Sequence, residues 1–515
     1  MTFNSLVFLL FYPVVLAGYW LCRRIGGKVG RNMAWVFLLA ASYFFYMYSQ
    51  WKLVGLIRFT TLVSWLCSLA IENINLKLAK AAEEGEPDHA LIRRAKAQKN
   101  LCLILTLVAS LGVLFYFKYV NFILGTASSI AGWFGHDPGW YIEGVLLPVG
   151  ISFYTFQTLS YAIDVYRGSI KTERHFGYYA LFVSFFPQLV AGPIERPGNL
   201  LPQLKEFLPV GGDDVRRGLH KIALGFFKKI AVADLISVYV NRVYNGGDIA
   251  DLPALAVVLA TLLFSVQIYC DFSGYTDIAI GCARLMGIRL MKNFDHPYIA
   301  RTVREFWGRW HISLSTWFRD YIYFPLGGSR CARWKHLRNV AIVFLISGLW
   351  HGAAWTFVIW GGLHAVYQIV GILTLPARDR LLSRCRLDPK GKAVGVVRTI
   401  LTFVLVTFAW LFFRANSTAD MILLLRVLFS PDAWRHGLGE VFGTLGMTLS
   451  GGLLTAASVV WLVLLDRVVP HGDEPDATAA PARQGVFILA VWAVFFAWTW
   501  LMKNDLTSTF IYFQF

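Results

Sequence analysis

The sequence is poor in charged residues for its length. Asp, Glu, Lys and Arg make up 15% of the 515 residues, whereas soluble domains contain roughly a quarter. Hydrophobic residues make up 57%, in repeated runs that are long enough to cross a bilayer. These runs are continuously apolar rather than alternating, which favours membrane helices over a β-barrel. We therefore expect an all-α polytopic membrane protein, with residues 1–515 forming a single membrane-embedded domain.

Cysteine is scarce and shows no pattern. None of the seven cysteines falls in a CxxC motif or at a spacing typical of metal ligands. Most of them lie in or beside apolar runs, so we expect small buried side chains rather than disulfides. The sequence also lacks a glycine-rich phosphate loop and a metal-type histidine spacing around His311 or His351. These absences predict a site without a bound metal.

Acidic residues are outnumbered by basic ones. The sequence has 31 Asp and Glu against 48 Lys and Arg, which gives a formal net charge of +17. In a soluble protein this excess would suggest a nucleic acid partner. Here the basic residues fall mainly in loops between apolar runs, which is the pattern of cytoplasmic loops in membrane proteins. We therefore expect contact with the lipid bilayer and no nucleic acid partner.

The apolar runs predict helices along most of the chain. The expected helices cover residues 5–22, 33–50, 53–71, 101–124, 145–166, 252–269, 340–373, 396–413, 421–429, 445–465 and 485–502. Residues 176–190 lead into two prolines and a glycine, so we expect a re-entrant turn or a surface segment there. Lys228 and Lys229 interrupt residues 218–240, so we expect two short helices or one interfacial helix there. Residues 284–338 contain no full span and are expected at the cytoplasmic face. The loop at 466–483 has the composition of a disordered segment.

His351 lies inside the longest of these runs. Both flanks of residues 340–373 are basic, so the run should begin and end on the cytoplasmic side, as a tight hairpin or a broken re-entrant pair with His351 near its turn. A polar side chain at membrane depth is costly and is a functional-site hypothesis by default. Gly348 and Gly352 allow close backbone approach, and Trp350 offers a large flat surface. The alternative is a buried histidine that bonds a neighbouring carbonyl.

A second group of polar residues directly follows the span at 252–269. It consists of Asp271, Ser273, Tyr275 and Asp277. In a helix, Asp271 and Tyr275 share one face, and Ser273 and Asp277 share another. Carboxylates at this depth must pair or face water. Two interpretations stay open, a functional site or an ion-pair network with Arg284 or Arg289 that holds helices together.

A third group lies between residues 305 and 324. At helical spacing, its apolar face consists of Trp307, Trp310, Leu314 and Trp317. On a neighbouring face His311 can bond Ser315 at i, i+4. Nearby arginines, including Arg309, could bind the phosphates of a nucleotide carrier. The alternative is an amphipathic helix in the interface, with its arginines on lipid headgroups. A histidine in a dry pocket suits general-base work on a hydroxyl, because its ordinary pKa is near neutral.

Several of these segments resemble a known family. The matching segments are residues 147–154, 157–167, 271–277, 293–294, 297–298, 305–317, 319–323, 326–328, 348–352 and 510–515. They are similar to the membrane-bound O-acyltransferase superfamily, and within it to the bacterial alginate O-acetyltransferase branch. The resemblance runs from Phe3 to Phe515 and weakens in the loops at 73–98 and 466–483.

The resemblance implies a fold and a set of site residues. The fold would be a ring of roughly 11 transmembrane helices, with re-entrant and interfacial helices, around a central funnel. His351 would be catalytic, and His311 a second important position on the cytoplasmic side. Supporting or donor-binding roles would fall to Asp271, Ser273, Tyr275, Asp277, Arg309, Trp310, Ser315, Asp320 and Trp350.

The same resemblance implies an activity and partners. The protein would be an inner-membrane O-acetyltransferase that takes the acetyl group of cytoplasmic acetyl-CoA, with no bound cofactor. The acceptor would be an exported polysaccharide, alginate- or cellulose-like, reached through a periplasmic acetyltransferase partner protein. Alternatives are acyl transfer to peptidoglycan, teichoic acid or lipid. A polymer-precursor transporter with histidine proton relays is a further alternative, but it would predict internal repeats, which the sequence does not show.

Overall fold

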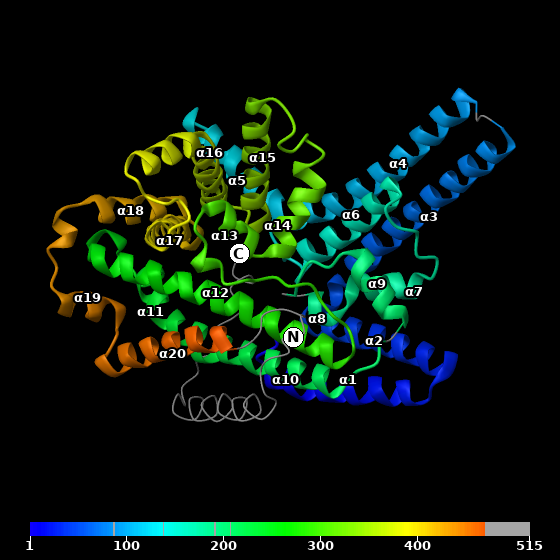
Figure 1. Cartoon of the computed structure of the whole chain (residues 1–515), viewed down its shortest axis with the longest axis horizontal. Helices are drawn as coiled ribbons and strands as arrows, with labels where there is room; N and C mark the ends of the chain where they lie inside the picture. The colour runs from blue at the N-terminus through cyan, green and yellow to red at the C-terminus, as the bar shows by residue number, and fades with distance from the viewer. Residues whose placement is uncertain (86–87, 137, 190–191, 207, 469–515) are drawn as a thin grey trace. The chain divides into compact units, whose positions relative to one another are not determined.

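The computed structural model describes residues 1–85, 88–136, 138–189, 192–206 and 208–468 (Figure 1). Every regular element in these ranges is a helix. Six helical stretches are long and apolar enough to cross a membrane, or seven if one bent pair counts as a span. The prediction of an all-α membrane protein is therefore confirmed. The predicted helix 485–502, the terminal segment 510–515 and most of the predicted loop 466–483 lie outside the described residues.

The described chain divides into two compact units. The first contains Met1–Ile222 and Ala279–Met291, and the second contains Ala223–Ile278 and the chain from Lys292 onward. The helices of the first unit are α1 Leu6–Arg24, α2 Gly27–Gln50, α3 Val54–Glu84, α4 His89–Leu114, α5 Val120–Trp133, α6 Ile151–Arg167, α7 Phe176–Ser184, α8 Phe186–Leu189, α9 Pro197–Glu206 and most of α10 Gly212–Phe226. Whether the chain forms a single domain stays a prediction.

In the first unit, α3 and α4 form a long antiparallel pair (Figure 1). Within residues 59–71 and 101–111 their exposed side chains are mainly apolar, as is typical of lipid-exposed helices, whereas the far ends at residues 77–84 and 89–96 expose charged side chains. Helix α6 differs, because nearly all of its side chains from Ile151 to Ala162 are buried. Its polar residues, such as Gln157, therefore face protein rather than lipid. Helix α6 is therefore not a purely lipid-facing span.

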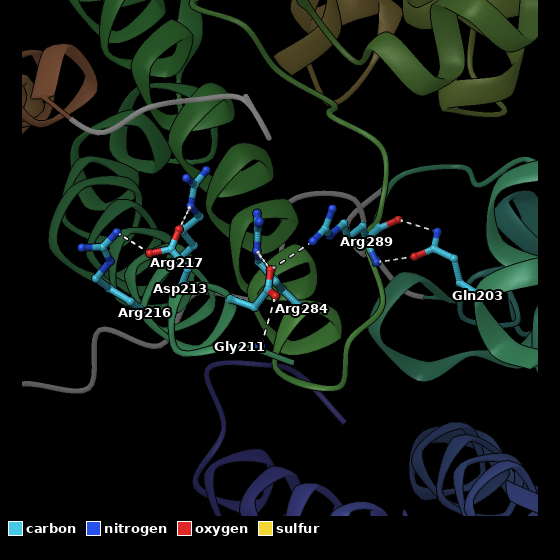
Figure 2. A network of polar contacts seen from close by, with 8 residues as sticks. Gln203, Gly211, Asp213, Arg216, Arg217, Arg284 and Arg289 are labelled. Carbon is cyan, nitrogen blue, oxygen red and sulfur yellow. Dashed lines mark hydrogen bonds and ion pairs between the residues drawn. The ribbon is translucent and has the colours of Figure 1, made fainter. Parts of the chain in front are cut away.

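The basic residues Arg284 and Arg289 belong to a polar network of the first unit (Figure 2). The Arg284 Nε lies 3.2 Å from Asp214 Oδ1, and Arg289 Nη2 lies 3.5 Å from the same oxygen. Asp214 is therefore an ion-pair partner of both arginines within this unit.

The helices of the second unit carry the candidate site. They are α11 Leu235–Tyr244, most of α12 Ala254–Leu285, α13 Val303–Arg309, α14 Ile312–Phe318, α15 Arg333–His351, α16 Trp355–Arg384, α17 Lys392–Arg414, α18 Thr418–Phe429, α19 Leu438–Leu445 and α20 Leu449–Val468. The predicted helix 445–465 instead begins at Leu449, since the chain bends by 74° between α19 and α20.

Residues 218–240 form one continuous helical stretch rather than two short helices. The helical backbone continues from α10 through a π-helical segment, Phe227–Asp234, into α11. Lys228 and Lys229 are buried rather than exposed at a break. Lysine is placed inside a protein when carboxylates pair with it, and such partners are present, as shown below.

The predicted hairpin at residues 340–373 is confirmed. Helix α15 ends at His351, α16 begins at Trp355, and the two pack against each other. Their backbones come close at two glycines. A Cβ added to Gly348 would lie 2.3 Å from the Phe357 carbonyl oxygen, and one on Gly361 would lie 2.3 Å from the Phe344 carbonyl oxygen. Only glycine fits at this crossing.

Replacing Gly348 by alanine is expected to push α15 away from α16 and to displace His351. Overpacking of this kind costs about 1–3 kcal/mol, and the thermal unfolding midpoint should fall accordingly. Gly362→Ala is the matched control, because the nearest atom to its added Cβ is Leu345 Cδ2 at 3.8 Å. Equal midpoints for the two purified variants would contradict the close crossing.

Candidate functional site

His351 is the last residue of α15 and is buried, with 4% of its surface exposed. Its imidazole is enclosed by aromatic rings from three helices. The ring centroids of Trp350, Trp360 and Phe413 lie 4.9, 5.0 and 5.4 Å away, each edge to face. The hairpin turn therefore places this histidine among aromatic rings, here called the aromatic pocket, which shield the imidazole from water.

His311 lies between α13 and α14 and is fully buried. Its backbone is left-handed, with φ of 44°, an uncommon conformation for a residue other than glycine and one that is frequent at functional sites. The Nδ1 atom lies 3.1 Å from Asn293 Oδ1 and 3.5 Å from Ser313 Oγ. The chain thus breaks at His311, where the sequence predicted one continuous helix.

The predicted bond between His311 and Ser315 is wrong. The Ser315 hydroxyl donates instead to the Trp310 carbonyl, at 3.2 Å. The i, i+4 geometry needs a helical His311, and the left-handed turn there points the imidazole elsewhere. The predicted apolar face survives the break, since all four of its residues are buried, namely Trp307, Trp310, Leu314 and Trp317.

The Trp350 ring contacts the rings of both histidines, His311 and His351. Its ring centroid lies 5.8 Å from that of His311 and 4.9 Å from that of His351. A third histidine, His364, is also buried nearby, and its Nδ1 accepts a hydrogen bond from Trp307 Nε1 at 3.2 Å. The structure therefore brings together the two histidines that the sequence singled out, from segments that are forty residues apart in the chain.

The aromatic cluster contains two residues that the sequence analysis missed, Trp410 and Phe413 of α17. Trp410 stacks on Trp360 with centroids 5.8 Å apart and lies 5.1 Å from Trp310. Their run, 396–413, looked like an ordinary apolar span. The sequence of that run does not indicate which of its aromatic side chains pack against the other helices.

Asp271 and Asp277 on α12 pair with the two buried lysines. Lys229 Nζ lies 2.8 Å from Asp271 Oδ1 and 2.8 Å from Asp234 Oδ1, while Lys228 Nζ lies 2.9 Å from Asp277 Oδ2. All five side chains are at most 9% exposed. The ion-pair interpretation is thus confirmed, with Lys228 and Lys229 among the cations.

Ser273 and Tyr275 are buried on α12 beside this cluster. The Lys229 ammonium lies 5.7 Å from the Tyr275 ring centroid, at a distance typical of cation–π contacts. A close glycine contact holds the two segments together, because a Cβ on Gly225 would lie 2.5 Å from the Gly274 carbonyl oxygen. A role in substrate binding for these residues stays a prediction.

Arg309 and Asp320 lie in local ion pairs. Arg309 Nη2 lies 2.9 Å from Glu305 Oε1, and its Nη1 donates to the Asp295 carbonyl at 3.2 Å. Asp320 Oδ1 lies 2.8 Å from Arg319 Nε. Both side chains are partly exposed, at 28% for Arg309 and 32% for Asp320.

The electrostatics of the site favour a neutral His311. Burial lowers the pKa of His311, which lies outside the apolar spans, to about 3. A neutral imidazole has one nitrogen with a lone pair that can take a proton from a hydroxyl. A pKa this far below neutral makes His311 a weak base, which suits a supporting role rather than the principal catalytic one.

Comparisons with known proteins show the family of this chain. Residues 5–413 match the model of the MBOAT, membrane-bound O-acyltransferase family. A probable alginate O-acetylase AlgI of Azotobacter vinelandii is 37% identical and aligns over 84% of this chain and 79% of its own. One of Pseudomonas putida is 34% identical over the full length of both chains. A peptidoglycan O-acetyltransferase of Helicobacter pylori is 32% identical over 82% of this chain and 79% of its own. With buried histidines in an all-helical membrane fold, this chain belongs to the membrane-bound O-acyltransferase family.

Proposed function

We propose that this multi-pass membrane protein is an inner-membrane O-acetyltransferase for an exported polysaccharide. Family membership makes the chain an O-acyltransferase. Similarity to proteins named as probable alginate O-acetylases, at 34–37% identity, favours an alginate-like acceptor. The main evidence for the location of the active site is the pair of buried histidines, His311 and His351, whose rings both contact Trp350.

In the proposed reaction, a histidine removes the proton of an acceptor hydroxyl. The hydroxyl oxygen then bonds to the acetyl carbonyl carbon of acetyl-CoA, the carbon–sulfur bond breaks, and the departing thiolate takes the proton from the histidine. We assign the catalytic role to His351, with His311 in support. The aromatic walls around His351 would exclude water and so limit hydrolysis of the thioester.

The donor and the acceptor would approach from opposite sides. We propose that acetyl-CoA enters from the cytoplasm near the arginine-rich segment that contains Arg309, Trp310, Ser315 and Asp320. Guanidinium groups suit its phosphates. The acetyl group would continue to a periplasmic acetyltransferase partner that modifies the polymer. The acetyl group would cross the membrane through a funnel that a ring of roughly 11 helices surrounds.

The buried cluster of Lys228, Lys229, Asp271 and Asp277 has a supporting place in this proposal. With Ser273 and Tyr275, it would hold α12 against the segment Phe227–Asp234 while the acyl group passes. Such a network fixes neighbouring elements when every charge in it has a partner.

The reaction is tested with purified protein in proteoliposomes and acetyl-labelled acetyl-CoA added outside. We expect thiol release that depends on the protein, with label appearing in a supplied alginate-type polymer when a periplasmic extract is present. Liposomes without protein are the control. Thiol release that leaves no label in any polysaccharide would contradict the proposed acceptor.

A second acceptor is supported by the Helicobacter pylori relative, which is named as a peptidoglycan O-acetyltransferase. A parallel reaction with peptidoglycan fragments distinguishes a peptidoglycan acceptor from an alginate-type acceptor. Label in peptidoglycan but not in the alginate-type polymer would favour this alternative over the leading proposal.

A further inference from the structure

The orientation of the Asn293 side-chain amide is fixed by a backbone group. The Ser313 backbone N–H lies 3.2 Å from the Asn293 Oδ1 atom. A backbone N–H can only donate, so the atom facing it must be the amide oxygen and not the amide nitrogen. The Ser313 hydroxyl donates to the same oxygen at 2.9 Å, and the amide nitrogen faces Thr276 Oγ1 at 3.5 Å.

This orientation decides which nitrogen of His311 carries the proton. The same Asn293 oxygen lies 3.1 Å from His311 Nδ1. Because an amide oxygen cannot donate, Nδ1 must carry the hydrogen of this bond. In the neutral ring the lone pair then belongs to Nε2. That atom is buried and has no hydrogen-bond partner within the described part of the protein.

The surrounding structure holds this geometry from several sides. The Ile312 N–H donates to the Asn293 carbonyl at 2.9 Å, and the Asp295 N–H donates to the Arg309 carbonyl at 2.9 Å. These two bonds keep the segment at Asn293 alongside the turn at His311. The Phe272 ring packs edge to face against the imidazole, 4.7 Å between centroids, and limits its rotation.

We propose that Asn293 is a positioning residue that holds His311 in the Nδ1–H tautomer and thereby presents Nε2 as the basic atom. The importance of this tautomer for turnover rests on the proposed function, in which His311 supports acyl transfer. The tautomer itself does not depend on that function, so the two can fail separately.

The tautomer is measured by ¹⁵N NMR of the full-length protein in lipid, labelled at histidine. The His311 signal is identified as the one that disappears in His311→Gln. We expect the wild type at neutral pH to show a protonated Nδ1 and an unprotonated Nε2 for this residue. A protonated Nε2 would overturn the proposal, whatever the activity of the variants.

The consequence for turnover is measured with Asn293→Leu and Asn293→Asp. Leucine has a similar size but no acceptor, so we expect the kcat for acetyl-CoA turnover to fall by roughly 10- to 100-fold, as for partners that orient other reactive histidines, with KM unchanged. Aspartate keeps an acceptor and should retain more of the rate. Its negative charge favours the imidazolium, so the acid limb of its pH profile should move to higher pH.

Asn339→Leu is the matched control, because Asn339 is equally buried but bonds the Leu326 and Gly328 carbonyls. It should leave the His311 signal unchanged. If it lowers kcat as much as Asn293→Leu does, or if Asn293→Leu keeps the wild-type rate, the positioning role is overturned. Full activity of His311→Gln would instead show that the proposed function fails at His311.

Discussion

A His351→Gln variant is expected to keep its fold and to lose acyl transfer by about 10²- to 10⁴-fold, the usual contribution of a positioned general base. Glutamine is close to histidine in size and polarity, so it fits among the rings of Trp350, Trp360 and Phe413. It cannot take up a proton near neutral pH. The loss should therefore appear in kcat, with little change in the KM for acetyl-CoA.

The control for this variant is His336→Gln on the same helix. His336 is partly exposed, near the start of α15, and its ring contacts Tyr323 rather than the aromatic pocket. We expect wild-type turnover from it. Rates of thiol release measured in proteoliposomes check both variants, and near-wild-type turnover by His351→Gln would remove this residue from the mechanism.

A Lys229→Met variant is expected to lose about 3–5 kcal/mol of stability, the usual cost of removing one partner from a buried ion pair. Lys229 is completely buried and lies 2.8 Å from both Asp234 and Asp271. Methionine matches the length of the lysine stem, so the loss is electrostatic. Two carboxylates would stay buried without their shared cation.

Unfolding in detergent, followed by thermal or denaturant titration, measures this loss. The control is Arg435→Met, because Arg435 and Asp432 form an ion pair in which both side chains are about four-fifths exposed, at 79% and 80%. Exposed pairs contribute at most about 1 kcal/mol. Adding Asp271→Asn to Lys229→Met should restore part of the stability, and a further loss in that double variant would speak against the buried pair.

The hairpin at His351 could be predicted from the sequence because two independent signals agreed. The length of the run requires a turn if both basic flanks lie on one side, and His351 falls near its middle. Hydropathy and charge are summed over many residues, so a single exception does not change the result. The structure places the turn directly after His351, at Gly352.

The partners of individual side chains could not be predicted in the same way. For Asp271 and Asp277, the sequence suggested arginines close by in the chain. Their partners Lys228 and Lys229 lie on another segment, where the two lysines suggested an interruption of the helix. For His311, a single left-handed residue ended the helix that the 3.6-residue period predicted. Local periodicity carries no information about such a residue.

The order in which the chain is synthesised gives the Lys228–Lys229 pair a consequence for membrane insertion. Of the three carboxylates that neutralise these lysines, only Asp234 belongs to the same segment, and the other two lie on α12. A segment with two ammonium groups is costly to place in lipid on its own. We therefore expect the translocon to retain residues 227–234 until α12 has emerged from the ribosome, so that the two segments enter the bilayer together.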